Sequence, residues 1–196
     1  MKRFSFFVFV IIFWLAACIP VTGSESPLPT LLPPETSTPL VQENNLVIYR
    51  DTKNKFEITY SKDIFTPDIE NSSADLLVLI LDIGKLFAGK NLENVTVRIS
   101  ASPVCRYKDI YYENTFTGEE TLNNINFSVY STRDAGTFSN VFETLTYQTY
   151  YNDLCYEIHL NIREYSLTAF PDVSEYDPEV IIIEFKNLLG TFKFIE

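Results

Sequence analysis

The sequence has few of the residue types from which most active sites and nucleic-acid interfaces are built. Its 196 residues include one histidine, three cysteines, and 15 lysines and arginines against 26 aspartates and glutamates. The formal net charge of −11 disfavours binding to nucleic acids or to anionic membrane surfaces, because both require basic patches. Three cysteines are too few for a disulfide-stapled mini-protein. Because 46% of the residues are hydrophobic, the chain can form a real core and general disorder is excluded.

The N-terminal segment, residues 1–17, has the pattern of a secretory signal peptide. A basic start is followed by an apolar run from Phe4 to Leu15, in which only Ser5 is polar. A helix needs ~20 apolar residues to cross a bilayer, so this run is too short to span one. Its length is typical of the apolar region of a signal peptide.

The next residues, Leu15-Ala16-Ala17-Cys18, resemble the lipobox of bacterial lipoproteins. The resemblance implies that the chain is cut before Cys18, that the Cys18 thiol becomes diacylglyceryl cysteine and that a fatty acid such as palmitate is often added to the new amino group. Two or three acyl chains make a stable anchor. A secretory signal with an accidental cysteine and an uncleaved anchor helix extending to Val21 are the alternatives. The lipobox predicts a lipoprotein anchored on the extracytoplasmic side of a bacterial membrane.

Residues 18–44 are predicted to be a tether that links the lipidated cysteine to a domain. They hold six of the ten prolines, and proline lacks the N–H that helices and sheets require. An ordered arm packed on the domain is the alternative interpretation. Since no second linker and no repeat follow, residues 45–196 are predicted to form a single domain.

Alternating apolar and polar residues predict a sheet. Residues 46–60 have the pattern of strand, polar turn and strand, and the apolar run 76–81 is typical of a strand covered on both faces. Short turns favour antiparallel pairing. Glu119-Glu120 is expected in a turn. Further strands are predicted at 95–100, 125–130, 140–151 and 154–165.

The C-terminal region has a helical pattern instead. Asp177 is a typical helix cap, Pro178 fits the first turn and Gly190 is a typical stop. The apolar residues between them share one helix face: Ile181, Ile182, Phe185, Leu188 and Leu189. A short strand is expected at 192–194. The predicted class is therefore α+β, an antiparallel β-sheet with a C-terminal helix packed on it.

Two stretches resemble a known group of proteins. The opening hairpin, Tyr49 to Tyr60, and the C-terminal stretch Phe185 to Phe194, with its Thr191-Phe192-Lys193-Phe194, look like those of small bacterial lipoproteins of uncharacterised function. That group is related to the PsbP/Mog1-like α/β/α fold. The resemblance implies an antiparallel sheet with helices on its faces, and it brings no catalytic residues because the family has no shared active site.

If Cys18 is lipidated, Cys105 and Cys155 remain as a pair. An exported chain meets oxidising conditions, in which two leftover thiols usually form a disulfide. Two free buried thiols are the alternative. Zinc needs three or four ligands, and Cys105, Cys155 and His159 would supply three only without the disulfide. We therefore expect a Cys105–Cys155 disulfide and neither a metal ion nor another cofactor.

The sequence favours a binding module of unknown ligand over an enzyme. It has no Gly-x-Ser-x-Gly motif, and one histidine cannot form a nucleophile relay alone. Tyrosine gives binding area at low entropic cost, so Tyr147, Tyr150 and Tyr151 are the candidate surface for a protein or saccharide ligand. An exported hydrolase with an unrecognised site and a structural component of the envelope are the alternatives. The expected partners are the membrane, reached through the lipid anchor, and an unknown protein or saccharide ligand, but no nucleic acid.

Overall fold

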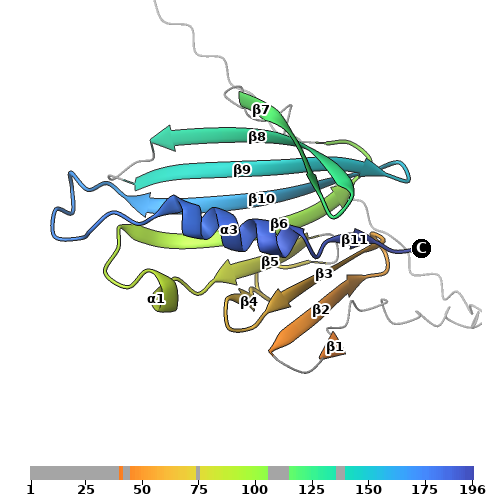
Figure 1. Ribbon diagram of the computed structural model, residues 1–196, viewed down its shortest axis with the longest axis horizontal. Helices are drawn as coiled ribbons and strands as arrows, with labels where there is room; N and C mark the ends of the chain where they lie inside the picture. Colours follow the sequence, from red (N-terminus) through yellow and green to blue (C-terminus); the bar gives the residue numbers. More distant parts are fainter. Residues whose placement is uncertain (1–39, 42–44, 74–75, 106–114, 136–139) are drawn as a thin grey trace, which may run out of the picture. The chain divides into compact units, whose positions relative to one another are not determined.

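The fold is seen in a computed structural model that describes residues 40–41, 45–73, 76–105, 115–135 and 140–196. Cys18, the predicted signal peptide 1–17 and the predicted tether up to residue 39 lie outside these ranges. The described elements form two antiparallel β-sheets and two helices (Figure 1). The helices are α1 (Ile83–Leu86) and α3 (Pro178–Leu189). Neither of them is long and apolar enough to cross a membrane.

The two sheets differ in size. The large sheet has seven strands in the order β4-β5-β6-β10-β9-β8-β7, and the small sheet has four in the order β1-β2-β3-β11. The strands of the large sheet are β4 (Phe65–Pro67), β5 (Leu76–Leu81), β6 (Leu92–Ser102), β7 (Thr115–Leu122), β8 (Ile125–Ala135), β9 (Asn140–Tyr151) and β10 (Leu154–Tyr165). The strands of the small sheet are β1 (Leu40–Val41), β2 (Leu46–Asp51), β3 (Phe56–Ser61) and β11 (Lys193–Phe194).

Most expected elements are present, and the α+β class is confirmed. One expectation is wrong: Glu119 and Glu120 lie in β7, at the edge of the large sheet, and not in a turn. A register shift between Phe116 and Gly118 hides the alternation of this strand, and Gly118 has a φ of +146°, which glycine tolerates. The pair Leu40–Val41, which falls inside the predicted tether, forms β1 and pairs with β2.

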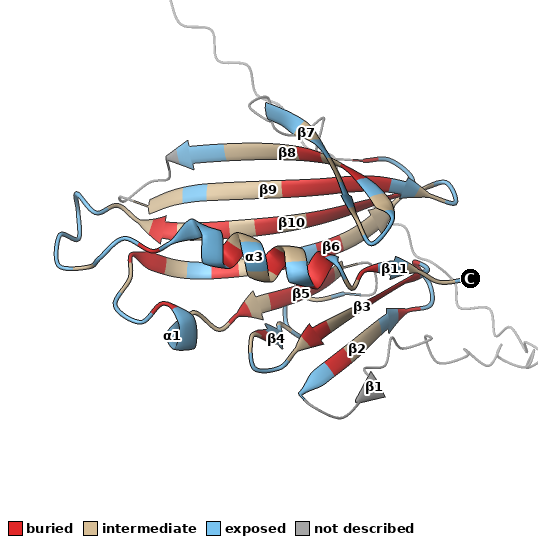
Figure 2. Ribbon diagram, viewed as in Figure 1, coloured by how far each residue is buried: buried red, intermediate tan, exposed pale blue. Residues whose placement is uncertain are grey.

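The C-terminal helix covers the apolar side of the large sheet. Asp177 caps it by accepting a hydrogen bond from the N–H of Glu179, as the sequence predicts. Figure 1 shows α3 lying across the middle strands, and Figure 2 shows that buried residues concentrate in those strands. The ring of Phe185 packs at 5.4 Å from that of Tyr147 on β9. The large sheet therefore has one face covered by α3 and an opposite face that α3 does not touch.

The end of the chain joins the two sheets. Phe192 is fully buried, and its ring lies 5.5 Å from Phe56 of β3 and 6.4 Å from Phe127 of β8. Just before it, the Thr191 hydroxyl accepts a hydrogen bond from the Thr59 N–H and donates one to the Thr59 carbonyl. The last residues thus fill the space between β3 and the large sheet.

A buried carboxylate connects three strands of the small sheet. Glu57 of β3 lies opposite Arg50 of β2 and Lys193 of β11, and its side chain is only 3% exposed. Its two oxygens contact Lys193 at 2.7 Å and Arg50 at 2.6 Å. The Lys193 contact holds the pKa of Glu57 below its ordinary value; burial opposes this shift and Arg50 reinforces it. The charged form of Glu57 therefore stabilises the fold.

Candidate functional site

The face of the large sheet opposite α3 is lined by polar side chains, and we call it the polar face. Successive side chains of a strand point to opposite faces of the sheet. The buried residues Ile158, Leu160 and Ile162 of β10 lie on the side covered by α3, as do their partners on the neighbouring strands, and the residues between them lie on the polar face. The register pairs the polar-face residues of β9 and β10 as Gln148–Glu157, Thr146–His159, Thr144–Asn161 and Phe142–Arg163.

These cross-strand pairs are joined by direct contacts. The Gln148 amide donates to Glu157 at 2.9 Å, the Thr146 hydroxyl lies 3.0 Å from His159 Nδ1, and the Thr144 hydroxyl donates to Asn161 Oδ1 at 3.2 Å. In the fourth pair the Arg163 guanidinium carbon lies 5.3 Å from the centre of the Phe142 ring. Cross-strand pairs of this kind stabilise neighbouring strands.

Exposed aromatic side chains gather on the same face. Phe142 and Tyr150 of β9 are 41% and 66% exposed, and both alternate with the residues that point toward α3. Phe116 of β7 is 54% exposed and lies opposite Tyr130 of β8. Tyr130 in turn lies opposite Thr146 of β9, so both rings are on the polar face. The polar face therefore carries aromatic rings on three neighbouring strands. Rings of this kind are typical of recognition surfaces.

A cavity of about 190 Å³ opens at one end of the polar face. Six polar-face side chains line it: Asn94, Thr96, Phe142, Thr144, Asn161 and Arg163. The Asn161 Nδ2 atom is buried and has no hydrogen-bond partner among the described residues, although the Oδ1 atom of the same amide accepts from Thr144. A buried donor without an acceptor costs roughly 1–3 kcal/mol. Almost none of the surface of this Nδ2 atom is accessible, and Arg163 Nε and Glu93 Oε2 are likewise buried without a hydrogen-bond partner among the described residues.

The central histidine is neutral at physiological pH. Burial lowers the pKa of His159 to about 4; nearby Glu157 opposes the shift and Arg98 reinforces it. Its hydroxyl neighbour Thr146 is fully buried. A nucleophile must reach its substrate, so this hydroxyl–imidazole pair is not arranged for nucleophilic catalysis.

The three tyrosines expected to form a binding surface are found in three different environments. Tyr147 is 3% exposed, lies under α3 and donates a hydrogen bond to Glu120. Tyr151 stacks on Phe194 with the ring centres 4.1 Å apart. Only Tyr150 is exposed, because adjacent positions on one strand face opposite sides. The three side chains therefore share no common surface, and Tyr150 alone belongs to the polar face.

The two cysteines of the domain are joined. Cys105 and Cys155 form a disulfide with their Cα atoms 5.3 Å apart, and both are buried. Disulfides persist in oxidising compartments, which indicates an extracytoplasmic environment. The Glu157 carboxylate lies within 4.8 Å of both sulfur atoms. A metal ion bound by this group would need the two cysteines as thiolate ligands, and they supply no thiolate while the disulfide is intact.

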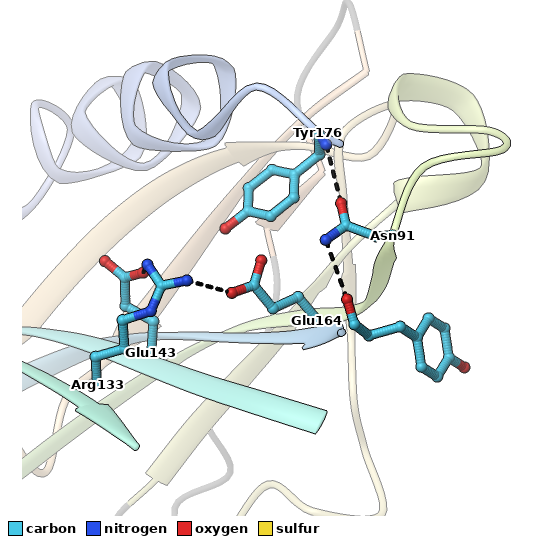
Figure 3. Close-up of polar contacts among 6 residues, drawn as sticks. Asn91, Arg133, Glu143, Glu164 and Tyr176 are labelled. Carbon is cyan, nitrogen blue, oxygen red and sulfur yellow. Dashed lines mark hydrogen bonds and ion pairs between the residues drawn. The ribbon is translucent and has the colours of Figure 1, made fainter. Parts of the chain in front are cut away.

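A second polar cluster lies on the covered side, near the start of α3 (Figure 3). Arg133 contacts Glu164 at 2.7 Å and Glu143 at 3.4 Å. Burial raises the pKa of Glu164, against the opposing effect of Arg133, and burial likewise raises the pKa of Tyr176 to about 12. Arg133 therefore neutralises two carboxylates on the covered side of the sheet.

Next to this cluster, the Asn91 side chain connects two segments of the chain by hydrogen bonds. Its Oδ1 accepts from the backbone N–H of Tyr176 at 3.0 Å, and its Nδ2 donates to the carbonyl of Tyr165 at 3.1 Å. Figure 3 shows both bonds. They hold the segment that precedes α3 against the end of β10. No sequence signal marks Asn91 or Glu164, since both depend on contacts between distant strands.

Comparison with known proteins gives no family. No model of a protein family matches the chain, and no curated protein matches it. Similar solved structures include a protein from Bacteroides thetaiotaomicron VPI-5482, with TM-score 0.45, 8% identity and coverage of 72% of this chain. This chain spans 45% of that protein's length.

A second similar structure is the PsbP protein (CyanoP) of the cyanobacterium Synechocystis sp. PCC 6803. It has TM-score 0.43 and 14% identity, with coverage of 83% of this chain and 99% of that one. It is of the PsbP type that the first hairpin and the C-terminal stretch resemble. Both TM-scores lie below 0.5, so neither structure defines the function of this chain.

Proposed function

We propose that the chain is a lipid-anchored binding module on the extracytoplasmic side of a bacterial membrane, and that the polar face is its recognition surface. The observation that carries this proposal is the coincidence of exposed aromatic rings and a cavity lined by polar side chains on one face, while α3 covers the other. The lipobox and the disulfide support an exported location.

The proposal includes the absence of catalysis. The Thr146 hydroxyl beside His159 is closed to substrate, and this argues against a hydrolase built on the sole histidine. A purely structural envelope component would have no use for an open cavity lined by polar side chains beside exposed aromatic rings, so a binding role accounts for these features better.

The anchor is tested by Cys18→Ser. We expect this substitution to abolish incorporation of a radiolabelled fatty acid and to move the protein from the membrane to the soluble fraction, because the serine hydroxyl does not take the diacylglyceryl group. The Cys105→Ala/Cys155→Ala variant is the matched control and should keep its label. Equal label on wild type and Cys18→Ser would show that the lipobox interpretation is wrong.

The recognition surface is tested by a photo-crosslinking amino acid carrying a diazirine, which reacts with proteins and glycans alike. Placed at Tyr150 on the polar face, it should form an adduct in intact cells. Placed at Ile183, which is 52% exposed on α3, it should form none. Adducts of equal yield from both positions, or from neither, would count against the polar face as the recognition surface.

A further inference from the structure

The outer side of β7 is the longest unpaired strand edge among the described residues. Of the four strands that end the two sheets, β1 and β11 have two residues each, and β4 has three, one of them Pro67. β7 has eight residues and no proline, and it pairs on one side alone, with β8 (Figure 1). Proteins usually protect sheet edges by shortness or by proline, so a long edge without either indicates a place where another strand adds.

We propose that β7 binds an extended segment of a partner protein, which joins the large sheet as a further strand and carries a basic residue. This inference rests on the proposed function, in which the chain is a binding module, and names its partner class. Every second residue of an edge strand directs its N–H and C=O away from the sheet, where an added strand can pair with them. Most of β7 is accessible, since five of its eight residues are exposed: Thr115, Phe116, Thr117, Glu119 and Thr121.

The bulge of β7 lies near one end of the strand and leaves the rest regular. The register shifts between Phe116 and Gly118, and the Thr117 hydroxyl donates to the carbonyl of Val129 at 3.1 Å. From Gly118 to Leu122 each residue has a partner on β8 without interruption. This part of β7 has the regular geometry that pairing with a further strand requires.

The charges of β7 select a basic partner over a second copy of the chain. Glu120 is held on the covered side by Lys186 at 2.8 Å, whereas the exposed Glu119 makes no ion pair with the described residues. Antiparallel pairing of two β7 strands about their centres would place Glu119 opposite Glu119, or Glu120 opposite Glu120. Like charges directly opposite each other destabilise a sheet, while a lysine or arginine opposite Glu119 stabilises it.

An exposed ring beside Glu119 adds a second requirement. Phe116 and Glu119 lie opposite Tyr130 and Ser128 of β8, so they occupy neighbouring positions on the polar face. The Phe116 ring packs at 5.5 Å from that of Tyr130 and is still 54% exposed. Alternate side chains of an added strand share this face, so two positions apart it should carry an apolar residue beside Phe116 and a basic residue beside Glu119. The partner segment thus continues the polar face by one strand.

The test begins with random peptides of about nine residues, the length of a long strand, displayed on phage and selected against the full chain in detergent micelles. We expect the selected peptides to share a lysine or arginine two positions from an apolar residue, and to lack proline between them. The most enriched peptide is then synthesised with a fluorescent label, and its binding is measured by anisotropy. Methylation of its backbone nitrogens at one alternate set of positions should abolish binding, and methylation at the other set should not, because only one set faces β7.

Variants of the chain locate the binding edge. Glu119→Lys should weaken binding of the selected peptide about tenfold, and selection against this variant should enrich an acidic residue in place of the basic one. Phe116→Ala should weaken binding several-fold. Glu70→Lys, which makes the same charge change at an exposed position between β4 and β5, is the matched control and should change binding little. Thermal unfolding of each variant shows whether it has kept its fold.

Three outcomes would overturn this inference: selection without a shared pattern, binding that Glu119→Lys leaves unchanged, or an equal effect of methylation at the two sets of positions. The crosslinking result separates it from the proposed function. If the adduct at position 150 forms and no peptide pattern is selected, the polar face recognises another kind of ligand and only the β7 inference fails. If the peptides bind β7 but position 150 gives no adduct, the polar face is not the recognition surface and the β7 inference stands. If neither occurs, both proposals fail.

Discussion

Replacing Cys105 and Cys155 together with alanine is expected to lower the free energy of unfolding by about 4 kcal/mol. The disulfide closes a loop with a sequence separation of 50 residues, and on the chain-entropy model a link of this length removes that much conformational freedom from the unfolded chain. For a domain of this size the melting temperature should fall by on the order of 10 °C. The disulfide also ties the segment just after β6 to the start of β10, and these two strands are neighbours in the large sheet.

Urea unfolding with and without a thiol reductant measures this effect. Wild type should lose stability when the reductant is added, and the double alanine variant should not respond to it. The reduced wild type and the variant should then have similar unfolding midpoints. If wild type and variant already unfold at the same urea concentration without reductant, the disulfide does not stabilise the domain.

The second large effect is expected from Glu57→Gln, which should cost about 2 kcal/mol at pH 7, because two charge-assisted contacts become weaker ones. Removing one partner of a fully buried ion pair destabilises a protein by more than this. Here the side chains of Arg50 and Lys193 are 47% and 56% exposed, so water can solvate their charges once Glu57 is replaced. The substitution keeps the shape of the side chain. It therefore isolates the contribution of the negative charge between β2, β3 and β11.

The pH dependence of this effect has a definite sign. The pKa of Glu57 is lowered in the folded state from the ordinary 4.5, so its contribution to stability is complete above pH 4.5 and is lost as the pH falls through the folded value. Unfolding of wild type and Glu57→Gln should therefore differ at pH 7 and converge in acid. Glu119→Gln, exposed on β7, is the matched control and should differ little from wild type at either pH. A difference that persists unchanged in acid would mean that shape, not charge, is responsible.

Alternation and caps were sufficient to predict helix α3 and five strands of the large sheet, β5, β6, β8, β9 and β10, because burial leaves a repeating pattern in the sequence; the three-residue strand β4 is too short to show one. They failed at β7, where a bulge at Gly118 and high exposure remove that pattern. The β2–β3 hairpin was also predictable, because its two strands are adjacent in the sequence. The disulfide was predictable because the chain has so few cysteines.

The candidate site was predictable only in part. The polar row around His159 follows from alternation within β10, but the unpaired amide of Asn161 depends on the register of β9, which no single strand reveals. The three adjacent tyrosines look alike in the sequence, yet the pleat sends Tyr147 inward and Tyr150 outward. Contacts across strands, and not local pattern, decide which polar atoms remain available.

The position of Phe192 between the two sheets also determines when folding can finish. A ribosome makes the chain from the N-terminal side, so the β2–β3 hairpin is made well before its partner β11 and before the ring that packs on Phe56. The bond between Thr59 and Thr191 spans 132 residues. A chain that does not yet include Phe192 therefore lacks the final contacts of its core, and the core stays open until that segment has been made.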